Sequence, residues 1–182
     1  MPFDTCNIKG LVIVAPAVFE DSRGHFFESY NEALFKKNGI EADFVQDNQS
    51  HSTHGVVRGL HYQQHPHAQA KLVRVLQGVI LDVAVDIRKD SPTYGQHFAI
   101  ELSAENKKQL FLPEGFAHGF SVLSAVAVVL YKCNAFYNKS SEGGIIYNDP
   151  ALNIDWRLKS GEAVVSDKDL QLPSFANAVS NF

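Results

Sequence analysis

The sequence contains few of the features that crosslink a protein or anchor it in a membrane. Its only cysteines are Cys6 and Cys133, which do not make a disulfide framework. Two reduced thiols are typical of a cytoplasmic protein, so we expect a cytoplasmic location. The N-terminal residues lack the basic and apolar segments of a signal peptide. The longest apolar stretch, 125–130, is too short to span a bilayer, and we expect no membrane partner.

An excess of basic residues is also missing. The chain has 16 Lys and Arg against 20 Asp and Glu, a net charge of −4, so no global basic field attracts nucleic acid and we expect no nucleic-acid partner. Any anionic ligand must therefore be met by a local group of cations. The length of 182 residues and an apolar content of 45% predict a single domain, 1–182, with a core that needs no disulfide or metal.

Strand signals dominate the sequence. Short runs of β-branched and aromatic residues are separated by turn residues, which indicates an all-β sandwich or barrel. Helical signals are few: Asn31 can cap a helix over 32–38 that Gly39 ends, and Ser166 can cap a second short one. The predicted strands are 11–18, 45–52, 56–60, 71–77, 79–87, 96–102, 109–112, 120–123 and 125–136.

Alternation predicts which faces of two strands are buried. In 79–88, Asp82 and Asp86 share a face with Ile80 and Ala84, and the opposite face, which carries Val79, Leu81, Val83, Val85 and Ile87, is predicted to be the core face. In 129–137, Tyr131 and Tyr137 share a face. These tyrosines can both reach one pocket, or they can be core aromatics with hydroxyls at the rim.

Three of the eight histidines lie close together, at His61, His65 and His67. Such a cluster first suggests a transition-metal site. The spacing of His65, His67, Lys71 and Gly78 resembles the first cupin motif, and 113–119 resembles the second. Metal-binding cupins normally have Glu where this chain has Lys71, and a cation there would repel the metal. We therefore expect no metal.

A pocket without metal must work with protons and charges. His61 can be a base, because the free imidazole titrates near neutrality. Lys71 can stabilise an oxyanion, and Tyr131 can donate a phenolic proton. An acidic residue in 166–169 can hold the tautomer of His61.

Eight segments in order carry a resemblance to the dTDP-4-dehydrorhamnose 3,5-epimerase family. The resemblance implies a homodimeric, cofactor-free isomerase with a cupin-like jelly-roll β-barrel and a few short helices. It also implies a dTDP-sugar substrate and a role in dTDP-L-rhamnose biosynthesis for cell-surface polysaccharides. The matching segments are 21–28, 46–50, 57–63, 71–78, 113–120, 131–132, 142–149 and 166–169.

Site residues follow from the same resemblance. His61 would be the base, Asp169 its partner, Tyr131 the acid on the opposite face of the sugar and Lys71 the oxyanion stabiliser. Positions that would hold the nucleotide sugar are Arg23, Glu28, Gln46, Asn48, Arg58, Lys71, His118, Tyr137, Glu142 and Lys168, with Tyr137 stacked on the thymine. Because Arg58 and His61 differ in strand parity, both can face one pocket only if the strand bulges, and Gly59 is where we expect the bulge.

The leading hypothesis is epimerisation at C3 and C5 of dTDP-4-keto-6-deoxy-D-glucose, which gives dTDP-4-keto-L-rhamnose. A mono-epimerase of a related dTDP-4-keto-6-deoxysugar is the nearest alternative. A metal-dependent cupin oxygenase or isomerase and a sugar-binding module without turnover are the other two hypotheses.

Overall fold

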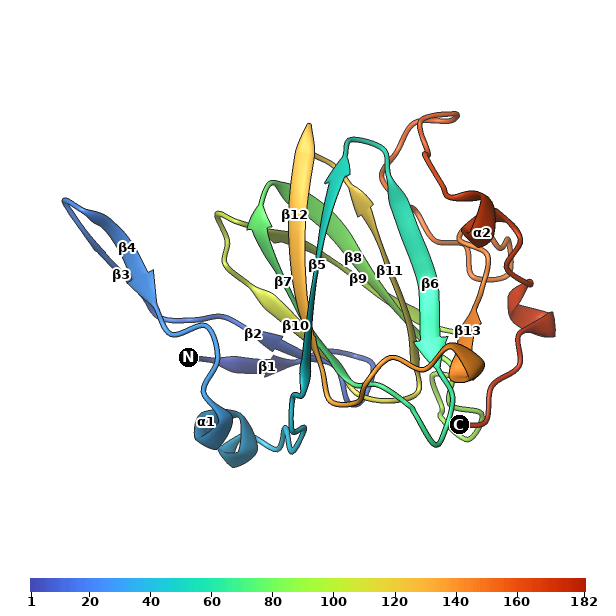
Figure 1. The fold of residues 1–182 in the computed structure, drawn as a ribbon, viewed down its shortest axis with the longest axis horizontal. Helices are drawn as coiled ribbons and strands as arrows, with labels where there is room; N and C mark the ends of the chain where they lie inside the picture. The colour runs from blue at the N-terminus through green and yellow to red at the C-terminus, as the bar shows by residue number, and fades with distance from the viewer.

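The computed structural model describes residues 1–182, which form two facing β-sheets with antiparallel strand pairs (Figure 1). One sheet has six strands in the order β1-β2-β10-β7-β12-β5, and the other has five in the order β13-β6-β11-β8-β9. A separate hairpin, β3-β4, projects from the side. The strands are β1 (Phe3–Thr5), β2 (Val12–Val14), β3 (Val18–Asp21), β4 (Gly24–Phe27), β5 (Gln46–Thr53), β6 (Val57–Gln63), β7 (Lys71–Gln77), β8 (Val79–Asp86), β9 (His97–Ser103), β10 (Gln109–Leu112), β11 (Phe116–Val122), β12 (Val126–Cys133) and β13 (Glu142–Gly144).

The all-β class expected from the sequence is confirmed, and most of the predicted strands are present. The predicted strand 11–18 was wrong as one unit, because Pro16 separates β2 from β3 and a proline has no N–H to donate to a ladder. The predicted strand 125–136 ends earlier, at Cys133, so Tyr137 lies in the loop beyond β12 and not on the strand. The unpredicted strands β1, β4 and β13 are each too short to give a clear alternation.

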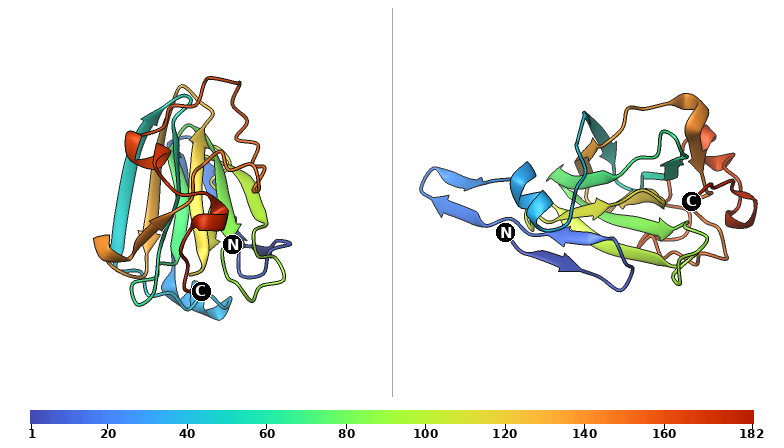
Figure 2. Two further views of the ribbon diagram at one scale, coloured as in Figure 1. Left: turned by 90° about the vertical axis from the view of Figure 1, so that its right-hand side faces the viewer. Right: turned by 90° about the horizontal axis from the view of Figure 1, so that it is seen from below.

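Strand β8 is buried on both faces, which corrects the prediction of one core face. Ile80 and Ala84 belong to the cluster between the two sheets and are fully buried. Leu81 and Val83 belong to a second cluster on the outer side of the five-stranded sheet. The C-terminal segment after β13 covers that outer side (Figure 2). The six-stranded sheet buries one face of β8 and the C-terminal segment buries the other. The alternation of residues in β8 therefore could not reveal which face points toward the other sheet.

A β-bulge in β6 lies at Gly59, as predicted. Arg58 pairs with Phe120 of β11 and His61 pairs with His118, so β6 has one more residue than β11 between these two pairs. Gly59 has a φ of +118°, and a Cβ there would lie 2.6 Å from the Cα of Gly119. The bulge reverses the parity of β6 and brings Arg58 and His61 to the same cavity.

The helices are short and are capped as the sequence predicts. Asn31 accepts a hydrogen bond from the backbone N–H of Leu34 at 3.1 Å and begins α1 (Glu32–Lys37). Ser166 begins α2 (Asp167–Leu170) in the same way, with 3.1 Å from its Oγ to the backbone nitrogen of Asp169. The 3₁₀ turns are η1 (Lys139–Ser141) and η2 (Phe175–Asn177). None of the helices has the length and apolar character needed to span a membrane.

Candidate active site

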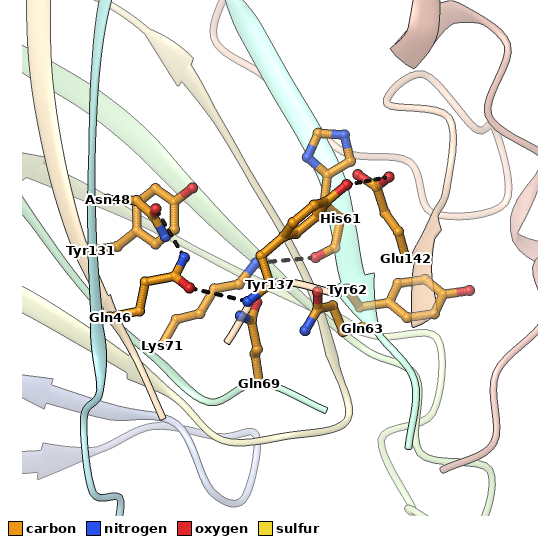
Figure 3. A pocket seen from close by; sticks show the side chains of 10 residues that line it. All are labelled: Gln46, Asn48, His61, Tyr62, Gln63, Gln69, Lys71, Tyr131, Tyr137 and Glu142. Carbon is orange, nitrogen blue, oxygen red and sulfur yellow. Dashed lines mark hydrogen bonds between the residues drawn. The ribbon is translucent and has the colours of Figure 1, made fainter. Parts of the chain in front are cut away.

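Polar side chains from both sheets line a cavity between them, made of two adjoining pockets that share His61, Lys71 and Tyr131. His61 comes from β6 of the five-stranded sheet, whereas Lys71 and Tyr131 come from β7 and β12 of the six-stranded sheet. Figure 3 shows His61 and Tyr131 on opposite sides with the Lys71 side chain between them. The other predicted site residues that line the two pockets are Gln46, Asn48, Arg58, His118, Tyr137, Glu142, Lys168 and Asp169.

His61 and Asp169 form a hydrogen-bonded pair across the edge of the sheet. Nε2 of His61 lies 2.9 Å from Oδ1 of Asp169, and the other carboxylate oxygen accepts from the backbone N–H of Gly59 at 3.3 Å. Burial acts to raise the pKa of Asp169, but hydrogen bonds from His61, Gly59 and Ser166 outweigh it, so the pKa lies below its usual value. A carboxylate at this distance favours the tautomer with the proton on Nε2, in which Nδ1 is free to accept a proton.

Lys71 places its amino group in the interior. Its side chain is buried, and its ammonium donates a hydrogen bond of 3.4 Å to the carbonyl oxygen of His61. Burial lowers the pKa of Lys71, and the nearby Cys133 and Asp82 oppose that shift. A buried ammonium with few partners is suited to bind an oxyanion, because the charge acts strongly in a site of low dielectric.

Tyr131 faces the cavity from β12 and is half-buried. Burial raises the pKa of its phenol, Cys133 raises it further and Arg58 acts in the opposite direction. The phenol therefore keeps its proton at neutral pH and can donate it. The ammonium of Lys71 lies 6.0 Å from the centre of the Tyr131 ring, so both groups line the same part of the cavity.

The mouth of the cavity has an aromatic side chain and an ion pair. Tyr137 is 56% exposed, and its hydroxyl lies 3.4 Å from Oε2 of Glu142. Lys168 donates to Oε1 of the same carboxylate at 2.7 Å. The side chain of Gln46 accepts from the backbone N–H of Tyr137 at 3.1 Å, so β5 fixes the loop that carries the ring (Figure 3).

Two predicted residues, Arg23 and Glu28, are not brought to this cavity. Arg23 lies at the tip of the β3-β4 hairpin, where its guanidinium pairs with Asp21 at 2.6 Å. Glu28 follows β4 and accepts a hydrogen bond from Asn31. Neither lines the cavity of its own chain. His65 and His67, the other members of the histidine cluster, lie in the loop between β6 and β7 and do not line it either.

Sequence reasoning assigned no role to several residues at the site. Gln63 and Gln69 hold the 134–138 loop: Gln63 accepts from the backbone N–H of Asn138 at 2.7 Å, and Gln69 donates to the carbonyl of Ala135 at 2.7 Å. Ser50 lines the pocket that also contains Arg58 and His118, and Oδ1 of Asp82 lies 2.8 Å from Nε2 of His118. Gln63 and Ser50 fall inside the segments that carried the resemblance, which was the available signal.

Comparison with known proteins shows the family of the chain. The sequence model of the family described as dTDP-4-dehydrorhamnose 3,5-epimerase matches residues 5–177. The chain belongs to this family. A Shigella flexneri protein of that name is 52% identical over 94% of each chain. The crystal structure of the Elizabethkingia anophelis enzyme has a TM-score of 0.92 and 50% identity, over 97% of each chain.

A further solved structure carries a ligand. The enzyme from Legionella pneumophila, solved in complex with dTDP-4-keto-L-rhamnose, is 47% identical with a TM-score of 0.91, over 95% of this chain and 92% of that one. Membership of the family confirms the cupin-like jelly-roll fold and the isomerase activity that the sequence predicted.

Proposed function

We propose that the chain inverts C3 and C5 of dTDP-4-keto-6-deoxy-D-glucose through enolate intermediates, with His61 as base, Lys71 as oxyanion stabiliser and Tyr131 as acid. The observation that carries the proposal is the position of the Asp169-oriented imidazole on one wall of the cavity and of the tyrosine on the opposite wall, with the buried ammonium between them. This arrangement provides each group that inversion beside a ketone requires.

Proton removal comes first. A C–H bond next to the C4 ketone is acidic because the electron pair left behind spreads onto the carbonyl oxygen. Nδ1 of His61 takes the proton, while Lys71 stabilises the developing oxyanion. Neither step needs a metal or an organic cofactor. One positioned acid or base typically contributes about 10²–10⁴ in rate.

Inversion then needs a proton from the other face of the planar enolate. Tyr131 is on the sheet opposite His61, so its phenol can deliver that proton as the carbonyl forms again. The tyrosinate must regain its proton, and the imidazolium must lose one, before the next cycle. Proton return from His61 itself would restore the original configuration.

The nucleotide would lie toward the mouth of the cavity. Tyr137 offers an exposed aromatic face for the thymine, and Arg58 and Lys168 provide the local cations that the pyrophosphate needs on an acidic protein. Gln46, Asn48, His118 and Glu142 would bind the remaining polar groups of the dTDP-sugar. The whole chain, 1–182, would act as one domain, because Asp169 near its C-terminal end completes the His61 pair.

A second copy of the chain would complete the site. Two aromatic side chains on the β3-β4 hairpin, Phe19 and Phe26, are 67% and 71% exposed, and an isolated two-stranded hairpin is marginally stable in water. In a homodimer this hairpin can pack on the partner and bring Arg23 and Glu28 to the partner's cavity. Light scattering should then give a dimer mass, and Phe26→Asp should shift it toward the monomer.

Deuterium exchange tests the reaction. Incubation of the protein with dTDP-4-keto-6-deoxy-D-glucose in deuterated water should label C3 and C5 and give the L-sugar. Label at one carbon alone would instead identify a mono-epimerase. Binding without any exchange would identify a sugar-binding module. We also propose a cytoplasmic location, which the two free cysteines support.

A further inference from the structure

One buried carboxylate behind the cavity has a hydrogen-bond partner for only one of its two oxygens. Asp82 lies on β8, on the face that points between the two sheets, and is fully buried. Its Oδ1 lies 2.8 Å from Nε2 of His118. Its Oδ2 is buried and has no hydrogen-bonding partner in the protein. Buried polar atoms in folded proteins nearly always have a partner, so an exception next to a site calls for a functional explanation.

Lys71 is a buried basic group on which Asp82 acts, because the negative charge of Asp82 opposes the lowering of the pKa of Lys71 by burial. Lys71 is on β7 of the six-stranded sheet, opposite Asp82, and its side chain is buried. Its one hydrogen bond goes to a neutral carbonyl oxygen at 3.4 Å. Besides Asp82, the titratable groups around it include the Cys133 thiol and Tyr131 of β12, His61 of β6, His118 of β11, Glu142 of β13 and Asp169 of α2. Glu142 is paired with Lys168, and Asp169 with His61. Asp82 has a carboxylate oxygen without a partner, and it is the carboxylate that acts to raise the pKa of Lys71.

We propose that Asp82 is a positioning residue for the epimerisation, which holds Lys71 as a buried cation through its charge and fixes the ring of His118 through its hydrogen bond. This inference rests on the proposed function, because it assigns Asp82 to the oxyanion side of that reaction. Asp82 itself does not line either pocket and acts only through these two side chains.

The physical reason is the cost of an isolated charge in the protein interior. A buried lysine without a counter-charge loses its proton, and its pKa can fall by several units. A neutral Lys71 could not stabilise an oxyanion by charge. Asp82 is held on a rigid central strand between β9 and β11, so its carboxylate stays in place when the substrate enters and leaves.

Asp82→Asn is the first test, because it removes the charge and keeps the shape. We expect kcat to fall roughly 10–100-fold near neutral pH, less than the loss of a direct oxyanion contact. The alkaline limb of the kcat profile should move to lower pH by about one unit or more, because Lys71 must be protonated to act. The affinity for dTDP should be unchanged. Glu101→Gln is the matched control, since Glu101 is an exposed carboxylate on the adjoining strand β9.

The shift of the alkaline limb separates this role from a merely structural one. If Asp82 only orients His118, kcat falls but the limb stays in place, and the proposal is wrong. NMR of ¹³Cε-labelled lysine in the wild-type protein gives a test that does not depend on the folding of the variant. The Lys71 signal, assigned by its loss in Lys71→Arg, should be that of an ammonium at neutral pH, and a neutral amine would overturn the proposal. Absence of exchange in the wild type would instead overturn the proposed function.

Discussion

Asp82 and Asp86 stand on the same face of the same strand, β8, and both are fully buried, yet their surroundings differ. Asp86 accepts from Nε and Nη2 of Arg88 at 2.8 and 2.7 Å, and from the hydroxyls of Ser91 and Thr93 at 2.6 Å each. Asp82 has one partner and one oxygen without any. The difference shows that burial of a carboxylate does not by itself reveal what it is for.

The two carboxylates lie four residues apart on β8, and we call the surroundings of Asp86 the closed end and those of Asp82 the open end. The Asp86 end is closed: Arg88 also donates to the carbonyl of Lys9 at 2.9 Å and packs over the ring of Phe116 at 4.5 Å. Every bond there joins protein to protein. The Asp82 end adjoins the cavity through His118, which lines it, and both Oδ2 of Asp82 and Oγ of the cavity-lining Ser50 have no hydrogen-bond partner in the protein. We therefore expect changes at the open end to affect catalysis and changes at the closed end to affect stability.

The largest effect should come from the open end. His61→Asn removes the base and keeps a polar side chain of similar size, so exchange at both sugar carbons should fall by about 10³-fold or more. The affinity for dTDP and the midpoint of thermal unfolding should stay close to wild type. His54→Asn, at an exposed histidine, is the control and should keep full activity. If His61→Asn instead lost activity because it unfolded, with a much lower midpoint of thermal unfolding, the distinction between the two ends would be wrong.

A change at the closed end should lower stability and leave catalysis unchanged. Burial acts to raise the pKa of Asp86, but hydrogen bonds from Arg88, Ser91 and Thr93 outweigh it and set the pKa to about 2. Asp86→Asn should lower the free energy of unfolding by about 2 kcal/mol, with kcat unchanged in the protein that remains folded. Asp47→Asn, at an exposed pair with Lys132, should change it by less than about 0.5 kcal/mol. Urea unfolding monitored by circular dichroism measures both.

The acid dependence of stability follows from the same pKa. The folded-state pKa of Asp86 lies below its ordinary value of 3.8, so its contribution is complete at neutral pH and is lost as the pH falls from about 4 toward 2. Asp86→Asn should therefore flatten the loss of stability in this range relative to wild type. If both proteins lose stability equally there, Asp86 is not the group responsible.

The sequence predicted much of this arrangement, because local patterns determine it. Strands 71–77 and 109–112 were predicted with their observed bounds, and the caps at Asn31 and Ser166 were predicted from short-range chemistry. The parity of Arg58 and His61 alone required a bulge at Gly59, and the structure has it. These features depend on neighbours along the chain, so a single sequence contains the information.

The rest depends on contacts between distant segments. That Asp82 has one oxygen with a hydrogen-bond partner and one without can be seen only after β8, β11 and β7 are assembled. The alternation of β8 predicted only that the face carrying Asp82 was not the core face. The position of Arg23 on a projecting hairpin also could not be predicted from its motif, because the motif identifies the residue and not the contacts of the hairpin that carries it.

The smallest effect should come from the mouth of the cavity, where groups are exposed. Tyr137→Phe keeps the ring and removes a hydroxyl whose one contact is 3.4 Å long, so KM should change by less than about threefold. Tyr137→Ala removes the ring, and KM should rise about tenfold with kcat little changed, since stacking is worth roughly 1–3 kcal/mol per base. Initial rates over a range of dTDP-sugar concentrations give both constants. Equal KM values for the two variants would mean that the hydroxyl, through Glu142, and not the aromatic face binds the nucleotide.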